Sequence, residues 1–409
     1  MDMIKDIRLI VLAAAMACVL MVKGQTAATA SDTAIANDGG DIRISLITCY
    51  PGSEIYELYG HTELRVTTPD SDIVYNYGVF DFNTPNFTYR FVKGDADYMV
   101  QGFPARYLKH GNAGRKMVEQ VLNLTPSAAL AIKNALEENA LPGNCKYRYN
   151  YVLDNCATRP RDIVEQAVGS SLNYGDMPEK MTFREEMHRY NNNYAWQQFG
   201  IDLALGSGLD YELDYREEMF VPMVLMCAFA SATYELDGKR VPLVDYSLII
   251  NPGSDDGAIL PPTPWYATPV TLAVVLLLLV AELSRRDYKR GKVCRVFDCV
   301  LFTVYGLLGC LIFFLIFESA HEATSPNYNA LWLHPFYLVP AILMWIKSCR
   351  KMVYFIHFLI FAVVLLTLVF WWALPQTANA AFFPLMALPA IRSLSYILIN
   401  RKCEKKATT

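Results

Sequence analysis

One cysteine of the sequence lies in a setting that can activate a thiol. Cys156 follows Asn155, a residue type that often caps helices, and the pattern of residues 155–168 predicts a helix that begins here. At a helix start, unpaired backbone N–H groups and the helix dipole stabilise a thiolate and lower the pKa of the thiol. Arg159 adds positive charge nearby, whereas Pro160 is expected to loosen the first turn. The sequence therefore predicts a cysteine nucleophile with a lowered pKa.

A thiol of this kind needs a base, and an imidazole is the usual one. His110 and His188 lie among polar residues without a recognisable partner, whereas Gly60 leads directly into a strand-like run that begins with His61. We therefore pair His61 with Cys156 as base and nucleophile. Judged by residue types alone, two structural roles stay open: a buried or disulfide-bonded cysteine, and a hydrogen-bonded histidine of the core.

A third residue could hold the imidazole in one tautomer. Asn76 lies on the predicted strand of residues 73–80, which returns after a turn, so its side-chain carbonyl can approach His61 and accept the other ring N–H. An asparagine satisfied by the backbone is the alternative for this position. Glu63 and Asp81 are weaker candidates for the same role.

A domain of strands followed by helices must position these residues. Runs rich in Val, Ile, Tyr and Phe, separated by turn residues, predict an antiparallel sheet of three or four strands. The predicted strands are residues 42–47, 62–66, 73–80 and 86–92. Helical spacing of apolar residues then predicts helices at 126–140 and 155–168. This order of elements predicts an α+β domain.

The N-terminal segment has the features of a signal peptide. Lys5 and Arg8 precede an apolar stretch over residues 9–22, and residues 28–30 read Ala-Thr-Ala, which matches a cleavage site. The stretch is shorter than the roughly 20 residues that cross a bilayer. We predict a signal peptide at residues 1–30, with an uncleaved anchor as the alternative. Either one exports the chain that follows.

Apolar segments long enough to cross a bilayer occupy the C-terminal third of the chain. They are residues 265–283, 296–317, 331–347, 352–373 and 379–400. Lys and Arg gather in the loops 284–295 and 347–351 and after residue 400, whereas the loops 318–330 and 375–379 contain none. Because positive loops stay in the cytoplasm, this alternation predicts a cytoplasmic C-terminus and places residues 31–262 outside.

Composition agrees with this division of the chain. Hydrophobic residues make up 53 % and charged residues 19 % of the 409 residues, too apolar for an ordinary soluble enzyme. The net charge of −4 gives no basic patch, so no nucleic-acid partner is expected. The predicted parts are a signal peptide (1–30), a periplasmic domain (31–250), a linker (251–264), an all-α domain of five transmembrane helices (265–401) and a cytoplasmic tail (402–409).

The exported domain contains too few cysteines for a disulfide scaffold. They are Cys49, Cys145, Cys156 and Cys227, and the sequence leaves their pairing open. In the last apolar segment, Arg392 is a costly charge for a bilayer, and such charges are usually functional or paired. Arg392 could hold a phospholipid phosphate or pair with an acid at a helix end.

The motifs around these residues resemble those of the Bacteroidota-type lipoprotein N-acyltransferases. The resemblance is carried by the group of five apolar segments and by the runs 45–52, 60–65, 76–82, 154–156 and 327–332. A histidine at the start of an early strand and a later Asn-Cys also resemble the circularly permuted papain-like arrangement of NlpC-like peptidases and lecithin–retinol acyltransferase. The likeness covers nearly the whole chain after the signal segment.

This resemblance implies a permuted papain-like exported domain on a five-helix membrane domain, in the inner membrane. Cys156, deprotonated by His61, would take an acyl chain from a phospholipid as a thioester. The N-terminal amine of a diacylated lipoprotein would then accept that chain. No metal or cofactor is implied. The candidate substrate-binding residues are Arg65, Tyr77, Arg159 and Arg392.

Two other functions stay open at this point. A membrane-anchored cysteine peptidase or amidase of the cell envelope would use the same two catalytic residues, although one span would suffice as its anchor. A non-enzymatic lipid-binding scaffold would instead pair Cys156 with Cys145 in a disulfide.

Overall fold

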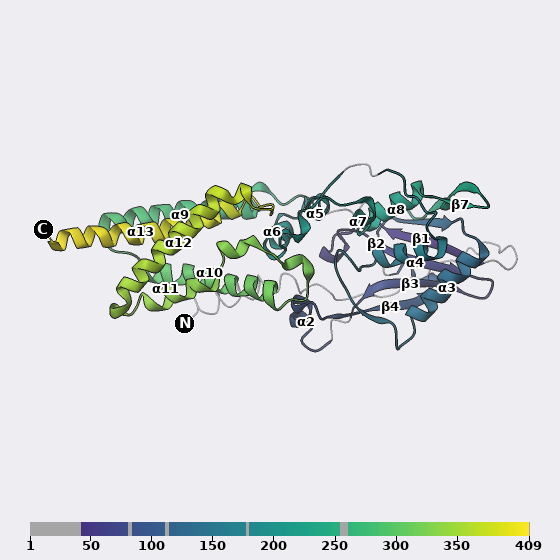
Figure 1. The fold of residues 1–409 in the computed structure, drawn as a ribbon, viewed down its shortest axis with the longest axis horizontal. Helices are drawn as coiled ribbons and strands as arrows, with labels where there is room; N and C mark the ends of the chain where they lie inside the picture. The colour runs from purple at the N-terminus through teal and green to yellow at the C-terminus, as the bar shows by residue number, and fades with distance from the viewer. Residues whose placement is uncertain (1–41, 81–83, 111–113, 177–179, 254–260, 409) are drawn as a thin grey trace. The chain divides into compact units, whose positions relative to one another are not determined.

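The computed structural model describes residues 42–80, 84–110, 114–176, 180–253 and 261–408. The predicted signal peptide, Asp81 and part of the predicted linker lie outside these residues. The described chain consists of a sheet domain followed by a helical domain (Figure 1).

A seven-stranded antiparallel sheet forms the centre of the first domain, in the order β6-β4-β3-β2-β1-β5-β9. Its strands are β1 (Arg43–Cys49), β2 (His61–Thr67), β3 (Asp72–Val79), β4 (Asp97–Pro104), β5 (Met117–Leu122), β6 (Lys146–Arg148) and β9 (Val244–Asn251). A separate hairpin contains β7 (Thr233–Leu236) and β8 (Lys239–Pro242). The predicted strands over 42–47, 62–66 and 73–80 are confirmed as β1, β2 and β3, but the sheet is larger than the three or four strands predicted.

Seven helices lie between the strands in the described part of the sheet domain. They are α2 (Phe87–Lys93), α3 (Pro126–Asn139), α4 (Thr158–Val168), α5 (Phe183–Asn191), α6 (Ala195–Ala204), α7 (Tyr215–Glu218) and α8 (Pro222–Ser231). Among them, α3, α4 and α8 pack on one face of the sheet. The predicted helix over 126–140 is confirmed as α3, whose first turn is capped by the side chain of Thr125.

The predicted strand over residues 86–92 is wrong, because this segment forms α2. The helix ends at Gly94, which adopts a φ of +77° and donates its N–H to carbonyls of the last turn. Phe87 and Phe91 lie one turn apart, with ring centroids 6.1 Å from each other. The aromatic composition that suggested a strand therefore serves a short helix with no buried residue.

The two faces of the sheet carry different side chains. Leu46, Leu64 and Tyr75 face the main core, where they pack with α3, α4 and α8. Side chains alternate along a strand, so their neighbours face the other way. Cys49 lies on this second face in a smaller apolar cluster, and His61 lies directly opposite it on β2. The start of β2 thus presents His61 away from the main core.

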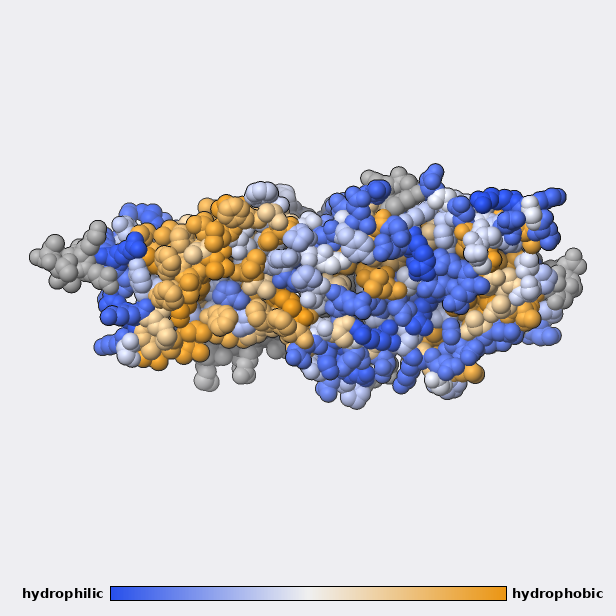
Figure 2. Space-filling view, in the orientation of Figure 1, coloured by the Kyte–Doolittle hydropathy of each residue, from blue (hydrophilic) through white to orange (hydrophobic). Residues whose placement is uncertain are grey.

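The helical domain contains α9 (Pro269–Arg290), α10 (Arg295–Phe317), α11 (Leu338–Leu343), α12 (Arg350–Phe370) and α13 (Phe382–Thr408). Within the described residues, three helical stretches are long and apolar enough to cross a membrane: Arg295–Phe317, Lys347–Ala373 and Phe382–Lys402. The second half of α9 carries Glu282, Arg285 and Arg286. On the face drawn in Figure 2, hydrophobic side chains cover much of this domain.

The third predicted span, residues 331–347, is not one long helix. It consists of short helical turns followed by α11, which is only six residues long. The segment packs closely on α10, where a side chain on Gly309 would collide with the backbone of His334. Non-helical backbone is tolerated at membrane depth where it is packed against protein. The prediction of a regular helix in this place is therefore wrong.

Arg392 is an internal ion-pair residue and not a phosphate ligand. Its side chain is fully buried on α13, with Nε 2.5 Å from Asp298 and Nη2 2.8 Å from Asp287. Nη1 donates to the hydroxyl of Ser284 at 3.0 Å. Because its donors contact α9 and α10, Arg392 joins three helices. Of the two roles left open by the sequence, the structure shows pairing with acids.

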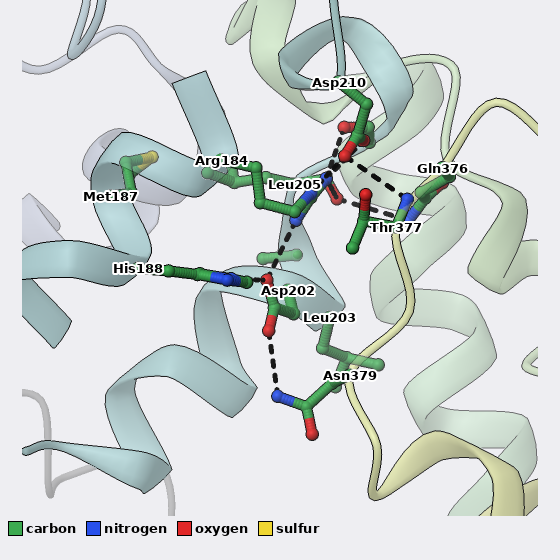
Figure 3. Close-up of polar contacts among 12 residues, drawn as sticks. Arg184, Met187, His188, Asp202, Leu203, Leu205, Asp210, Gln376, Thr377 and Asn379 are labelled. Carbon is green, nitrogen blue, oxygen red and sulfur yellow. Dashed lines mark hydrogen bonds and ion pairs between the residues drawn. The ribbon is translucent and has the colours of Figure 1, made fainter. Parts of the chain in front are cut away.

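A buried polar cluster connects the sheet domain to the loop before α13 (Figure 3). Arg184 of α5 donates to Asp202 at 3.1 Å and to Asp210 at 2.8 Å. Asn379 donates from the loop to the other oxygen of Asp202 at 2.8 Å, and the backbone N–H of Thr377 lies 3.3 Å from Asp210. Arg184 therefore pairs with the two carboxylates, Asp202 and Asp210, that also accept hydrogen bonds from the loop before α13.

Candidate active site

Cys156 lies just before α4 and not within its first turn. The helix begins at Thr158, three residues after the start of the predicted range 155–168. Ala157, and not Asn155, is the N-cap, but Oδ1 of Asn155 accepts hydrogen bonds from the backbone N–H groups of Ala157 at 2.8 Å and Thr158 at 3.0 Å. With this start, Pro160 falls in the first turn, where a backbone N–H has no partner within the helix. The predicted loosening by Pro160 therefore does not arise.

Three groups favour the thiolate form of Cys156 and act to lower the pKa of its thiol. They are the backbone N–H of Thr62, the hydroxyl of Tyr149 and the backbone N–H of Cys156 itself. Burial is nevertheless the largest influence and raises the pKa of the thiol to about 11, with a further increase from Glu63. The prediction of a lowered pKa is wrong for this reason. At neutral pH the group is a thiol that needs a base to react.

His61 is held by Asn76. The Oδ1 atom of Asn76 lies 2.9 Å from Nε2 of His61, whose side chain is 23 % exposed. Because an amide oxygen only accepts, this contact assigns the proton to Nε2 and leaves Nδ1 as the basic nitrogen. Burial lowers the pKa of His61, although Glu63 and Asn76 act in the opposite direction. The imidazole is therefore neutral at pH 7 and able to accept a proton.

The fold brings the three sequence-predicted residues to one region. Thr62, whose N–H bonds the sulfur of Cys156, directly follows His61 on β2. On the neighbouring strand, a bulge follows Asn76 at Gly78, which has a φ of +91°. A side-chain carbon on Gly78 would lie 3.9 Å from the Cβ of Cys156. The start of β2 and the bulge in β3 thus both lie next to Cys156.

A carboxylate lies beside the histidine. Glu63 is 1 % exposed, and its Oε1 lies 4.0 Å from Nε2 of His61. Its Oε2 has no hydrogen-bond partner among the described residues. Burial raises the pKa of Glu63, while His61 and Arg115 lower it. Asn76 lies directly across from Glu63 on β3. Asn76 is the closer hydrogen-bond partner of His61, and the charge of Glu63 acts on the pKa of His61 from a longer distance.

Two of the candidate substrate-binding residues are fixed in ion pairs. Arg65 lies 2.7 Å from Asp72 and 3.1 Å from Glu119. Arg159 is bonded to Asp154, with donor–acceptor distances of 2.5 Å and 2.7 Å. Both arginines have their charge balanced by neighbouring acids. Neither is placed as a free cation for a lipid phosphate.

Tyr77 is a core residue. Its side chain is 0 % exposed and belongs to the main core, and its hydroxyl accepts a hydrogen bond from Asn139 at 3.0 Å. A fully buried ring cannot contact a substrate, so the prediction for Tyr77 is wrong. Its position follows from the alternation of β3, which turns Asn76 and Tyr77 to opposite faces.

The cysteines of the exported domain are free thiols within the described residues: Cys49, Cys145, Cys156 and Cys227. Cys145 and Cys156 therefore form no disulfide, which removes the structural basis of the scaffold reading. Tyr149 and Gly78 are site residues that the sequence analysis missed. The alternating tyrosines at 147, 149 and 151 were the available signal for the first of them.

Two family models match the chain. Residues 32–188 match the Lnb N-terminal periplasmic domain, and residues 262–404 match the Lnb transmembrane domain. The chain belongs to the Lnb family. The resemblance found in the motifs is thereby confirmed. No curated protein and no solved structure gives a significant match.

Membership in the Lnb family gives the broad role of the chain. It is a membrane enzyme of lipoprotein processing, with a periplasmic domain ahead of a membrane domain in the inner membrane. The Lnb periplasmic match contains both His61 and Cys156. The reaction itself must be argued from the site.

Proposed function

We propose that the protein is a lipoprotein N-acyltransferase that forms a thioester on Cys156. The acyl donor is a phospholipid, and the acceptor is the N-terminal amine of a diacylated lipoprotein. The observation that carries the proposal is the link between the sulfur of Cys156 and the N–H of Thr62, which directly follows His61 of the His61–Asn76 pair, in a chain of the Lnb family. A thiol, a neutral imidazole and an amide that orients it are the parts of a Cys-His-Asn acyl-transfer site.

The first half-reaction moves the acyl chain to the enzyme. Nδ1 of His61 takes the thiol proton as the sulfur of Cys156 attacks the ester carbonyl. The new S–C bond forms, the ester C–O bond breaks, and the proton passes from His61 to the leaving oxygen of the lysophospholipid. The N–H of Thr62 and the hydroxyl of Tyr149 stabilise negative charge on the sulfur. The raised pKa of Cys156 makes this step dependent on His61.

The second half-reaction moves the acyl chain to the lipoprotein. The acceptor arrives as an ammonium group, which loses one proton to solvent before it can attack. The neutral amine attacks the thioester carbonyl, and His61 takes one of its two protons and passes it to the sulfur of Cys156, while the other stays on the amide nitrogen. The N–C bond forms and the S–C bond breaks. Both substrates are membrane-anchored, so a membrane-bound enzyme meets them already oriented.

The proposal is tested with the full-length protein in vesicles of phospholipid with an isotope-labelled acyl chain. We expect intact-mass spectrometry to find the label on Cys156, and peptide analysis to find it on the N-terminus of an added diacylated lipoprotein. A cysteine amidase would instead cleave envelope peptides and leave the lipoprotein amine free. Lipoproteins that stay diacylated with the active protein would refute the proposal.

We also infer a cytoplasmic C-terminus. The loops before and after the broken third segment reach opposite ends of the helical domain. Asn327 donates to the carbonyl of Leu203 in the sheet domain at 3.0 Å. At the other end, Arg350 bonds Asn400 at 2.9 Å. The basic loops of the sequence gather at this second end, which supports its placement in the cytoplasm.

A fluorescent-protein fusion after residue 409 tests this orientation. We expect the fusion to fluoresce, because common fluorescent proteins do not mature when they are exported unfolded. Alkaline phosphatase fused to the same residue should be inactive, since it needs the oxidising periplasm. An active phosphatase fusion would contradict the orientation.

The charge of Glu63 should set the pH dependence of the reaction. Protonated His61 cannot act as a base, so activity falls as pH drops through its pKa, which burial holds below the ordinary value. Glu63→Gln removes a negative charge that raises the pKa of His61. We therefore expect the acidic limb of kcat/KM to move to lower pH.

The control for Glu63→Gln is Glu137→Gln. Glu137 is a half-exposed partner of Lys133 on α3, and its variant should leave the pH profile unchanged. If the acidic limb of Glu63→Gln stays in place or moves to higher pH, Glu63 is not ionised beside His61 in the working enzyme.

A further inference from the structure

Aromatic rings line up between Cys156 and the helical domain. The row begins at Tyr149, whose hydroxyl bonds the sulfur of Cys156. Neighbouring rings lie 4.3–6.1 Å apart between centroids. We call this set the aromatic row, and its members in order are Tyr149, Tyr98, Phe80, Phe87 and Phe91.

The outer end of the row contacts the segment that follows α10, one of the candidate membrane spans. The ring of Phe91 lies 6.2 Å from His321, just beyond α10, and Nε2 of His321 lies 2.8 Å from the carbonyl of Phe91. The hydroxyl of Ser319 donates to the carbonyl of Val92 at 2.9 Å. Tyr89, on the same short helix, lies 6.1 Å from Phe314 of α10. In Figure 1, α2 accordingly lies beside the end of α10.

Exposure changes along the row. Phe91, the outer member of the row, is 45 % exposed, and Tyr89 beside it on α2 is 56 % exposed. The helix α2 contains no buried residue. Phe80 and Phe87 are half-buried, and Tyr98 is buried. Exposed aromatic residues next to a membrane span are typical of groups at the membrane interface. The row therefore leads from an interface-like surface to the thiol.

The polar groups beside the row are largely paired with each other. Arg90 of α2 lies 3.5 Å from Asp95 and 3.2 Å from Asp97. Lys93 lies 3.2 Å from Asp95. Since these charges are already balanced, the surface is better suited to an apolar ligand than to a polar peptide.

We propose that the aromatic row binds the acyl chain of the phospholipid donor and guides it from the membrane to Cys156. This inference rests on the proposed function. Exposure of each CH₂ group of an acyl chain to water is unfavourable, so the path of the chain to the nucleophile must be apolar. Because the row continues to the end of α10, a candidate membrane span, we commit to a membrane lipid as the ligand of the row. The lipoprotein peptide then approaches from another side.

Photo-crosslinking tests the binding directly. Full-length Cys156→Ser is placed in vesicles that contain a phospholipid with a diazirine midway along one acyl chain, and labelled peptides are mapped by mass spectrometry. We expect crosslinks within residues 87–98 and 147–151, in addition to those on the membrane helices. The serine variant cannot form the thioester, so binding is measured apart from turnover. Crosslinks confined to α9–α13 would overturn the inference.

Variants of the exposed outer end provide the second measurement. Phe91→Ala and Tyr89→Ala should lower the rate of Cys156 acylation by long-chain phospholipid about three- to tenfold, since an aromatic contact contributes about 0.5–1.5 kcal/mol beyond burial. The rate with a short, soluble ester should be unchanged. Tyr107→Ala is the matched control, because Tyr107 is 49 % exposed and lies outside the row. Equal losses with long and short donors would overturn the inference.

The two proposals fail in different ways. If wild-type Cys156 is acylated but the row is not crosslinked, the row does not bind the chain and the proposed function stands. If the row is crosslinked but no donor acylates Cys156, the row binds lipid and the thioester mechanism is wrong. Crosslinks on the row from a photoreactive lipoprotein peptide, with none from the phospholipid, would assign it to the acceptor instead.

Discussion

Cells that carry only the Cys156→Ser variant should accumulate lipoproteins with a free N-terminal amine, while the variant protein inserts and accumulates normally. Serine keeps the shape of the site, but its hydroxyl is a far weaker nucleophile than a thiolate. His61→Ala should have the same effect, because removal of a general base typically costs a factor of about 10² to 10⁴ in rate. The raised pKa of Cys156 strengthens this expectation, since little thiolate forms without the base.

The double variant of Cys156 and His61 makes the test sharper. Residues that act as one unit show strongly non-additive losses, so it should be no less active than either single variant. Cys227→Ser is the matched control, because Cys227 is an exposed free thiol elsewhere on the domain. Mass spectrometry of lipoprotein N-termini gives the result. Normal N-acylation by a well-expressed Cys156→Ser variant would rule out the thioester mechanism.

Arg184→Met should destabilise the protein by about 3–5 kcal/mol, the usual cost of removing one partner from a buried ion pair. Arg184 and Asp202 are each 1 % exposed and Asp210 is 5 % exposed, so water cannot replace the lost cation. Methionine fills a similar volume, which limits the effect of an empty space. Because both carboxylates also accept from the loop at 377–379, we expect the junction with the helical domain to loosen first.

Thermal unfolding of the purified full-length protein measures this effect. The loss corresponds to a fall in Tm of roughly 3–6 °C for a chain of 409 residues. The matched control is Arg216→Met, since Arg216 is 51 % exposed in its ion pairs and such pairs contribute about 0–1 kcal/mol. Equal Tm values for Arg184→Met and the wild type would mean that the cluster is not buried in the working protein.

The candidate site was largely accessible from local sequence patterns. An Asn-Cys pair before a helix and a glycine before a histidine-led strand named Cys156 and His61. The turn between β2 and β3 allowed Asn76 to be placed near His61, because the register of a hairpin depends on few residues. The structure finds Asn76 at 2.9 Å from the histidine. Each of these inferences used neighbours close in the chain.

The properties that depend on burial were not accessible in this way. The helix dipole predicted a lowered pKa of Cys156. Chain segments distant in sequence bury the sulfur, however, and this burial raises its pKa. Arg392 could be recognised as costly, but its partners Asp298 and Asp287 lie 94 and 105 residues away in sequence. The aromatic row likewise combines the residue that follows β3, the helix α2, the strand β4 and the segment before α4.

The sequence by itself determined the division of the chain into a periplasmic domain and a membrane domain, the family, and the choice of Cys156 and His61 as the candidate pair. It could do so because hydropathy, charge in loops and short motifs are local properties. Only the tertiary structure decided that residues 331–347 form a broken segment packed on α10, that Tyr77 is buried, and that Tyr149 reaches the thiol. These depend on contacts between distant residues, whose packing and desolvation no local pattern specifies.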